Sequence, residues 1–265
     1  MELYNEEGDF RPSRRSWFLL IALMCIAAVL GGVISLALMG NRLSGAVLSQ
    51  LLRGNEEITR ASLVYELVGP SVIGISNMAP YGPEREQSNG SGVIYSADGY
   101  IITCAHVVAN AGRLIVTLAD GRQFDAELVG KDDNTDLALL KIPLGGLPAA
   151  TFADSDTVRV GDPALSIGNP GGLYYARSLS YGVVSGLNRQ VQTSGGQTVG
   201  KLIQSDAATN SGSSGGALVN IKGEVIGINS VKMPTKDGYE GMSFATPSNV
   251  AKAVAEELIR KREDK

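Results

Sequence analysis

From about residue 63 onward the chain consists of short apolar runs separated by turn dipeptides, and this pattern restricts the fold more than any other feature. The run over 92–95 is followed by Asp98-Gly99 and then by the run over 100–103. Asp-Gly between two apolar runs is a hairpin signal. The same alternation recurs around Asp120-Gly121 and Lys222-Gly223. Many short strands at close spacing predict an all-β barrel or sandwich.

Residues 248–262 show a different pattern, that of one long helix at the end of the chain. Val250, Val254 and Leu258 share one helical face, and Lys and Arg side chains gather near the C-terminus, where they complement the helix dipole. Ser248 is of a residue type that caps helix N-termini. We therefore expect a C-terminal helix over 248–262 that is capped by Ser248.

The segment from Trp17 to Gly40 contains 24 consecutive residues without a charge. As a helix rising about 1.5 Å per residue it would cross the roughly 30 Å hydrocarbon layer, whereas the apolar core of a cleaved secretory signal, the alternative, is usually about 7 to 15 residues long. Three arginines precede the run, and two follow it within 13 residues. The positive-inside rule then predicts a cytoplasmic segment over 1–16, a transmembrane helix over 17–40 and an extracytoplasmic remainder.

Residues 41–62 are expected to link this anchor to the folded domain. Leu43, Val47 and Leu51 recur at helical spacing, which indicates an amphipathic stalk or a surface that packs on a neighbour. A short helix lying on the domain fits the same pattern.

Composition narrows the choice of partners. The net charge is −4, and no basic block interleaved with aromatic residues is present, so we expect no nucleic-acid partner. The two cysteines are Cys25, within the apolar run, and Cys104. Their number excludes a disulfide framework and a cysteine-rich metal site, and with one histidine a zinc site would need mostly carboxylates. We expect neither a metal nor a cofactor.

His106 is the only histidine of the chain, so chemistry that needs an imidazole has a single candidate. A serine hydroxyl becomes a good nucleophile when a base takes its proton and a third group orients that base. Here His106 follows a predicted strand, Asp136 precedes the apolar run 137–140, and Ser214 lies in a glycine-rich turn. The order His, Asp, Ser is one of three known for this geometry. We expect these residues to form a catalytic triad.

Glycines surround Ser214 in the segment 210–216. Backbone amides can point into the space beside a nucleophile only where the chain turns tightly, and glycine adopts the required angles without strain. We therefore expect the amides of Gly212 and Ser214 to form an oxyanion hole.

With the motifs around them, these residues resemble the chymotrypsin-like serine proteases, and most closely the HtrA (Deg, Do-like) family. The resemblance covers about residues 90–250. It rests on segments that occur in the family's order: Gly90-Ser91-Gly92-Val93-Ile94, Asp98-Gly99-Tyr100-Ile101, His106-Val107-Val108, Thr135-Asp136-Leu137-Ala138, Val160-Gly161-Asp162, Ile167-Gly168-Asn169-Pro170, Ile203-Gln204-Ser205-Asp206-Ala207-Ala208, the turn 212–216, Gly223-Glu224-Val225-Ile226-Gly227-Ile228-Asn229 and Phe244-Ala245-Thr246-Pro247-Ser248-Asn249.

The resemblance implies a protease domain over 63–262, built from two six-stranded antiparallel β-barrels of the chymotrypsin type. The first barrel, about 63–145, would carry His106 and Asp136, and the second, about 150–247, would carry Ser214. The C-terminal helix would follow, and the triad would lie between the barrels.

For the substrate, the resemblance implies that Ser243, Phe244 and Ala245 form the pairing strand and part of the specificity pocket. It also implies assembly as a homotrimer and a location on the periplasmic or cell-surface side of a bacterial membrane. The family commonly carries PDZ domains after the protease domain, and we expect none in this chain, which ends after one helix.

Two functions fit these observations. The first is a membrane-anchored serine endopeptidase that hydrolyses unfolded or exposed segments of extracytoplasmic proteins through an acyl-enzyme. The alternative is a protease-like peptide-binding or chaperone protein with a weak or silent site. The alternative draws on one departure from the family, because Ser211 and Ser213 stand where relatives often have Pro and Asn.

Overall fold

The computed structural model describes residues 60–81, 85–192, 198–232 and 241–264. The predicted cytoplasmic segment 1–16, the predicted transmembrane helix 17–40 and nearly all of the linker 41–62 lie outside these ranges. No helix in the described ranges has the length and apolar character needed to cross a bilayer.

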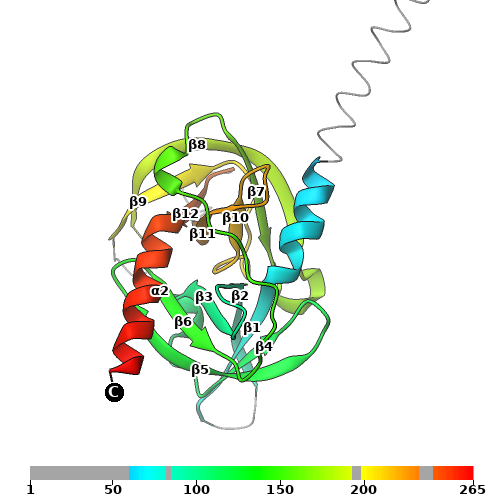
Figure 1. Cartoon of the computed structure of the whole chain (residues 1–265), viewed down its shortest axis with the longest axis vertical. Helices are drawn as coiled ribbons and strands as arrows, with labels where there is room; N and C mark the ends of the chain where they lie inside the picture. Colours follow the sequence, from blue (N-terminus) through cyan, green and yellow to red (C-terminus); the bar gives the residue numbers. More distant parts are fainter. Residues whose placement is uncertain (1–59, 82–84, 193–197, 233–240, 265) are drawn as a thin grey trace, which may run out of the picture. The chain divides into compact units, whose positions relative to one another are not determined.

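The first half of the described chain forms a closed antiparallel barrel of six strands (Figure 1). Around the barrel the strands follow the order β1-β2-β3-β6-β5-β4, and β4 pairs with β1 to close it. The predicted turns at Asp98-Gly99 and Asp120-Gly121 join β2 to β3 and β4 to β5. The strands are β1 (Val72–Met78), β2 (Glu86–Ile94), β3 (Tyr100–Cys104), β4 (Arg113–Thr117), β5 (Gln123–Asp132) and β6 (Leu137–Lys141).

A second closed six-stranded barrel follows, in the order β10-β11-β12-β9-β8-β7 (Figure 1). All of its strand pairs are antiparallel, and the predicted turn at Lys222-Gly223 joins β10 to β11. The two barrels confirm the predicted chymotrypsin-like, all-β architecture. The strands are β7 (Pro163–Gly168), β8 (Ser178–Gln192), β9 (Thr198–Ser205), β10 (Ala217–Val219), β11 (Val225–Lys232) and β12 (Ser243–Pro247).

The first β-strand begins later in the chain than the pattern of apolar runs and turn dipeptides predicted. Residues 60–68 are helical, a 3₁₀ turn, η1 (Gly69–Ser71), follows, and the first strand starts at Val72. Val64 and Val68, four residues apart on one helical face, are buried in the main core. Apolar burial therefore selects a helix at the start of this region, where strands were expected from about residue 63.

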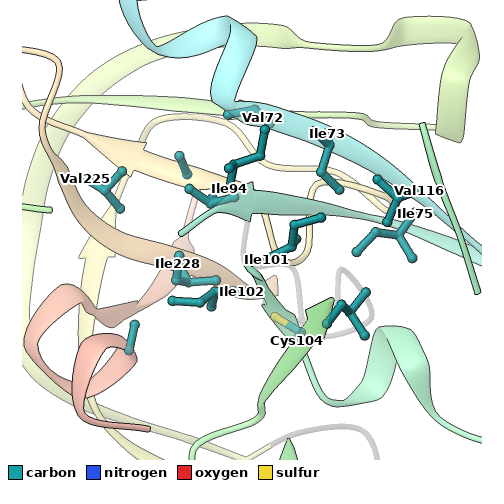
Figure 2. Packing of buried hydrophobic residues seen from close by; sticks show 14 of the residues in the cluster. Val72, Ile73, Ile75, Ile94, Ile101, Ile102, Cys104, Val116, Val225 and Ile228 are labelled. Atoms are coloured by element: carbon teal, nitrogen blue, oxygen red, sulfur yellow. The ribbon is translucent and has the colours of Figure 1, made fainter. Parts of the chain in front are cut away.

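The main hydrophobic core contains side chains from both barrels, as Figure 2 shows for part of it. Each fully buried Val or Ile contributes about 1.5–3 kcal/mol relative to the exposed state. The continuity of this core holds the barrels together as one unit. The labelled residues from the first barrel are Val72, Ile73, Ile75, Ile94, Ile101, Ile102, Cys104 and Val116, and those from the second are Val225 and Ile228.

Helix α2 (Ser248–Glu263) follows the last strand, as predicted, and packs against β5 and β6 of the first barrel and β11 and β12 of the second. Its buried face includes Ala251 and Ala255. The expected cap is wrong, because Pro247 occupies the N-cap position and Ser248 is the first helical residue. The buried Ser248 hydroxyl instead donates to the carbonyl oxygen of Ala153 at 2.8 Å. A tertiary contact has replaced the local one.

Asn169, just after β7, ties the barrels together by hydrogen bonds. Its Nδ2 donates to the carbonyl oxygen of Ile73 in β1 at 2.7 Å, and its Oδ1 accepts from the amide of Arg177 at 2.8 Å. Its own amide donates to Ser91 Oγ in β2 at 2.8 Å. The residue is 1% exposed, so losing these partners would leave buried polar groups unsatisfied.

We expect Leu140→Ala to lower the free energy of unfolding by about 2–5 kcal/mol, because Leu140 is fully buried and the truncation leaves a cavity. Leu128→Ala is the matched control, since Leu128 is the cross-strand neighbour of Leu140 but is 41% exposed. Urea unfolding of both variants measures the difference. Equal losses would contradict the assignment of Leu140 to the core.

Candidate active site

His106 lies on the 3₁₀ turn η2 (His106–Val108), directly after β3 and Ala105. Its Nδ1 is 2.8 Å from Oδ2 and 3.0 Å from Oδ1 of Asp136, and its backbone amide donates to Oδ1 at 3.1 Å. The side chain is 51% exposed, so about half of its surface is open to solvent. One carboxylate thus fixes both the backbone and the ring of His106.

Asp136 precedes β6 and has a positive φ of 55°, a conformation that aspartate tolerates better than most residues. The residue is 8% exposed, and its carboxylate also accepts a hydrogen bond from Ser230 Oγ at 2.8 Å. Burial by itself raises the pKa of this carboxyl group. The hydrogen bonds from His106 and Ser230 and the charge interaction with His106 outweigh burial, so the pKa of Asp136 lies below its ordinary value.

Ser214 lies in the turn between β9 and β10. Its Oγ donates to the carbonyl oxygen of Ser230 at 3.0 Å. None of the hydrogen bonds among the described residues joins Ser214 Oγ to His106. The structure therefore brings His106 and Asp136 into direct contact, and it connects Ser214 to them through Ser230.

The turn around Ser214 is fixed by the hydrogen bonds of its carbonyl groups. Ser91 Oγ donates to the carbonyl of Gly212 at 2.7 Å, and the amide of Ser91 donates to the carbonyl of Ser214 at 2.8 Å. The carbonyl of Ser211 accepts from Gly171 at 2.8 Å. The φ angle of Gly212 is +95°, and a Cβ there would lie 2.4 Å from the carbonyl oxygen of Asn169. Only glycine fits this position.

Two amides of the turn remain available as donors. In the described ranges neither the amide of Gly212 nor that of Ser214 donates a hydrogen bond. In a trans peptide the N–H points opposite to the preceding carbonyl. Because the carbonyls of Ser211 and Ser213 are bound by Gly171 and Gly216, both N–H groups are directed away from those contacts. Such a pair of free amides can stabilise an oxyanion.

The three residues predicted to contact substrate lie on β12. Strand β12 pairs with β11 on one edge and with β9 on the other, so these residues lie within the sheet of the second barrel. Phe244 is 6% exposed and packs in a small core cluster with Leu202. Ser243 Oγ lies 2.8 Å from Thr209 Oγ1.

Ser230 is the residue that sequence reasoning missed. It falls in β11 where the pairing with β12 shifts register between Asn229 and Lys232, and it contacts both Asp136 and Ser214. The sequence showed it only as the residue after a family-like motif ending at Asn229. Its role depends on which strands meet when the barrels pack, and no local pattern encodes that.

Cys104 lies behind the His106–Asp136 pair and is fully buried. Its Sγ donates to the carbonyl oxygen of Asn229 at 3.2 Å. Burial, followed by the negative charge of Asp136, raises the pKa of the Cys104 thiol well above its ordinary value. Sγ and the nearest ligand atoms of His106 and Asp136 all lie within 4.8 Å of one another, which makes these three a group that could hold a metal ion.

The two antiparallel barrels are the fold of a trypsin-like peptidase domain. The family model "Trypsin-like peptidase domain" matches residues 90–228, and the chain belongs to this family.

Its curated relatives are HtrA and DegP proteins, which confirms the resemblance drawn from the sequence. Serine protease Do-like HtrA of Bacillus subtilis is 40% identical over 226 residues, covering 78% of this chain and 50% of that protein. Periplasmic serine endoprotease DegP of Escherichia coli is 46% identical over 172 residues, covering 64% of this chain and 35% of that protein. The chain thus spans half or less of the length of these two relatives.

Solved structures agree. The HtrA-type protease AlgW with tripeptide superposes with a TM-score of 0.68 and 41% identity, covering 75% of this chain and 63% of that chain. The serine endoprotease from Yersinia pestis gives a TM-score of 0.64 and 36% identity, covering 76% of this chain and 66% of that chain.

The lowered pKa of Asp136 predicts a pH-dependent contribution to stability. Its folded-state pKa lies below the unfolded value of about 3.9, so the stabilisation is present above that pH and is lost as the pH falls through the folded-state pKa. We expect the difference in free energy of unfolding between the native protein and Asp136→Asn to narrow below about pH 4. Urea unfolding at a series of pH values measures it, and a constant difference down to pH 3 would contradict the argument.

Proposed function

We infer that this chain is a serine endopeptidase in which Ser214 is the nucleophile, His106 the general base and Asp136 the group that orients the base. The observation that carries this assignment is the pairing of His106 Nδ1 with the buried Asp136 carboxylate at 2.8 Å, beside a turn that presents Ser214 and two free amides. An imidazole whose Nδ1–H is donated to a carboxylate keeps Nε2 free to accept a proton.

In the proposed reaction the Ser214 hydroxyl turns about its Cα–Cβ bond from Ser230 toward His106 Nε2. Oγ attacks the carbonyl carbon of the scissile bond while its proton passes to Nε2, and Asp136 stabilises the imidazolium that forms. The amides of Gly212 and Ser214 bind the oxyanion. His106 then protonates the leaving amine. In the second half of the reaction water attacks the acyl-enzyme while His106 takes its proton, and His106 returns that proton to Ser214 Oγ as the acyl group leaves.

The carbonyl oxygen of Ser230 is the proposed acceptor for the substrate main chain. It lies 3.0 Å from Ser214 Oγ, where β11 departs from regular pairing with β12. When the hydroxyl turns toward His106, this carbonyl is released beside the nucleophile. Ser243, Phe244 and Ala245 are then proposed to form part of the wall of the specificity pocket and not the pairing strand.

The setting of the enzyme is also proposed. The apolar segment 17–40 would anchor the chain in the membrane and place the peptidase outside the cytoplasm, consistent with the description of the Escherichia coli relative as periplasmic. Unfolded or exposed segments of extracytoplasmic proteins would be the substrates, and a homotrimer would be the assembly.

A second candidate function is a peptide-binding or chaperone protein with a silent site. It is favoured by one observation, the hydrogen bond from Ser214 Oγ to Ser230 in place of His106. A phosphonate probe for active serines separates the two functions. Labelling of the native protein but not of Ser214→Ala supports the peptidase, whereas an unlabelled native protein supports the binder.

We expect Ser214→Ala to lower the turnover of an unfolded protein substrate by up to about 10⁶-fold, as removal of the nucleophile does in other triads. His106→Ala should have a comparable effect, because no other histidine exists to replace it. Ser185→Ala, a partly exposed serine in β8, is the matched control and should keep native turnover. Full activity in Ser214→Ala would exclude the proposed mechanism.

Ser91→Ala tests how the turn is held. The change removes the donor to the Gly212 carbonyl and the acceptor for the Asn169 amide, so buried groups lose their partners at a cost of about 1–3 kcal/mol in stability. Ser91 holds the carbonyl of the Gly212–Ser213 peptide, so this peptide should become free to turn and should disturb the adjacent Gly212 amide. We expect kcat to fall by about 10²-fold with little change in KM, as when one oxyanion donor is lost. Steady-state kinetics beside Ser88→Ala, an exposed serine of the same strand, measures the effect.

A further inference from the structure

Three side chains of different chemistry converge on one point behind the catalytic imidazole. Cys104 ends β3, His106 follows it on η2, and Asp136 precedes β6. β3 and β6 are hydrogen-bonded neighbours, and Cys104 pairs with Leu137. The thiol sulfur, an imidazole nitrogen and a carboxylate oxygen consequently lie within 4.8 Å of one another. The nitrogen that faces the carboxylate is Nδ1, 2.8 Å from Oδ2. The reaction proposed above uses two of the three and leaves the thiol without a role.

This donor set is the one that zinc prefers, namely a thiolate, an imidazole nitrogen and a carboxylate oxygen. In a tetrahedral zinc site with bonds of about 2.0–2.3 Å, ligand atoms lie about 3.3–3.7 Å apart. The His106 ring would therefore retreat from Asp136 by about half an ångström, from the present 2.8 Å. A ring whose side chain is 51% exposed has room for that movement.

Charge and access also suit a divalent cation. A thiolate and a carboxylate together cancel the two positive charges, so the buried site becomes neutral when it is occupied. The Ser230 hydroxyl, 2.8 Å from Asp136 Oδ2, or a water molecule could complete the tetrahedron. Solvent reaches the pair from the exposed side of His106.

We propose that Zn²⁺ binds Cys104 Sγ, His106 Nδ1 and an oxygen of Asp136, and that occupancy of this site reversibly switches the peptidase off. Binding breaks the S–H bond of Cys104 and releases that proton to solvent, because the thiolate is the ligand. The zinc–nitrogen bond displaces the proton from Nδ1, which moves to Nε2. One proton is released in total, and no oxidation or reduction takes place.

Inhibition follows from the tautomer that the metal imposes. An imidazole metallated at Nδ1 and protonated at Nε2 cannot accept the proton of Ser214. In a Ser-His-Asp triad the wrong tautomer alone lowers kcat by about 10⁴-fold. Saturating zinc should therefore reduce turnover by a similar factor, and a chelator should restore it.

The first test rests on the proposed function, since it follows peptidase activity of the full chain during titration with zinc. Native protein should lose turnover, and Cys104→Ala should need at least about 10-fold more zinc for the same loss, because even an outer-shell partner contributes 10–100-fold to metal affinity. Cys104→Ser, which keeps nearly the same shape but offers a poor zinc ligand, should behave like Cys104→Ala. Equal sensitivity of the native protein and both variants, or no inhibition of the native protein, would overturn the proposal.

The second test does not depend on catalysis. Full-length Ser214→Ala protein that also carries Cys25→Ala is titrated with Cd²⁺, whose bond to a thiolate gives an ultraviolet charge-transfer band. Cys104 is then the only cysteine left. A band that saturates at one ion per chain and disappears when Cys104→Ala is added supports the site. Absence of the band would refute the site even if the native protein is an active peptidase. The band together with a native protein that has no peptidase activity would refute only the proposed function.

Discussion

The site depends on one buried carboxylate. Asp136 accepts hydrogen bonds from the backbone and ring of His106 in the first barrel and from the Ser230 hydroxyl in the second. A charged group at 8% exposure is tolerated only when such donors replace water. The barrels must therefore pack in one register for this carboxylate to be satisfied. The geometry of the imidazole is set by the same contacts that join the two halves of the fold.

The turn that presents Ser214 shows how tightly the second barrel meets the first. A Cβ at Gly215 would lie 2.1 Å from the carbonyl oxygen of Ser91, so the turn rests directly on strand β2. Ser211 and Ser213 replace residues that are common in the family. The turn is held through carbonyl groups, by Ser91, Gly171 and Gly216. The Ser213 side chain adds one long hydrogen bond within the turn, from the Asn210 amide to its Oγ at 3.4 Å. The substitutions therefore leave its main-chain anchors in place.

The hairpins of the two barrels and the turn around Ser214 could be predicted from the sequence because short local motifs encode them. Asp-Gly and Lys-Gly dipeptides marked hairpins, and the glycine-rich segment marked the turn around Ser214. What could not be predicted depends on contacts between distant segments. Ser230 gains its position from a register shift in β11, and β12 is enclosed because its barrel closes on both sides. Ser248 does not cap the helix for the same reason, because its hydroxyl donates to the carbonyl of Ala153, which lies 95 residues earlier in the chain.

The hydrogen bond from Ser214 to the Ser230 carbonyl has a consequence for selectivity under the proposed mechanism. The same oxygen is the resting acceptor for the nucleophile and the proposed docking point for a substrate N–H. A peptide that donates to this oxygen competes with the serine hydroxyl and frees it to turn toward the imidazole. The backbone of the substrate thus activates the nucleophile that cleaves it. A small ester without that N–H would leave the Ser214 hydroxyl bound to the Ser230 carbonyl.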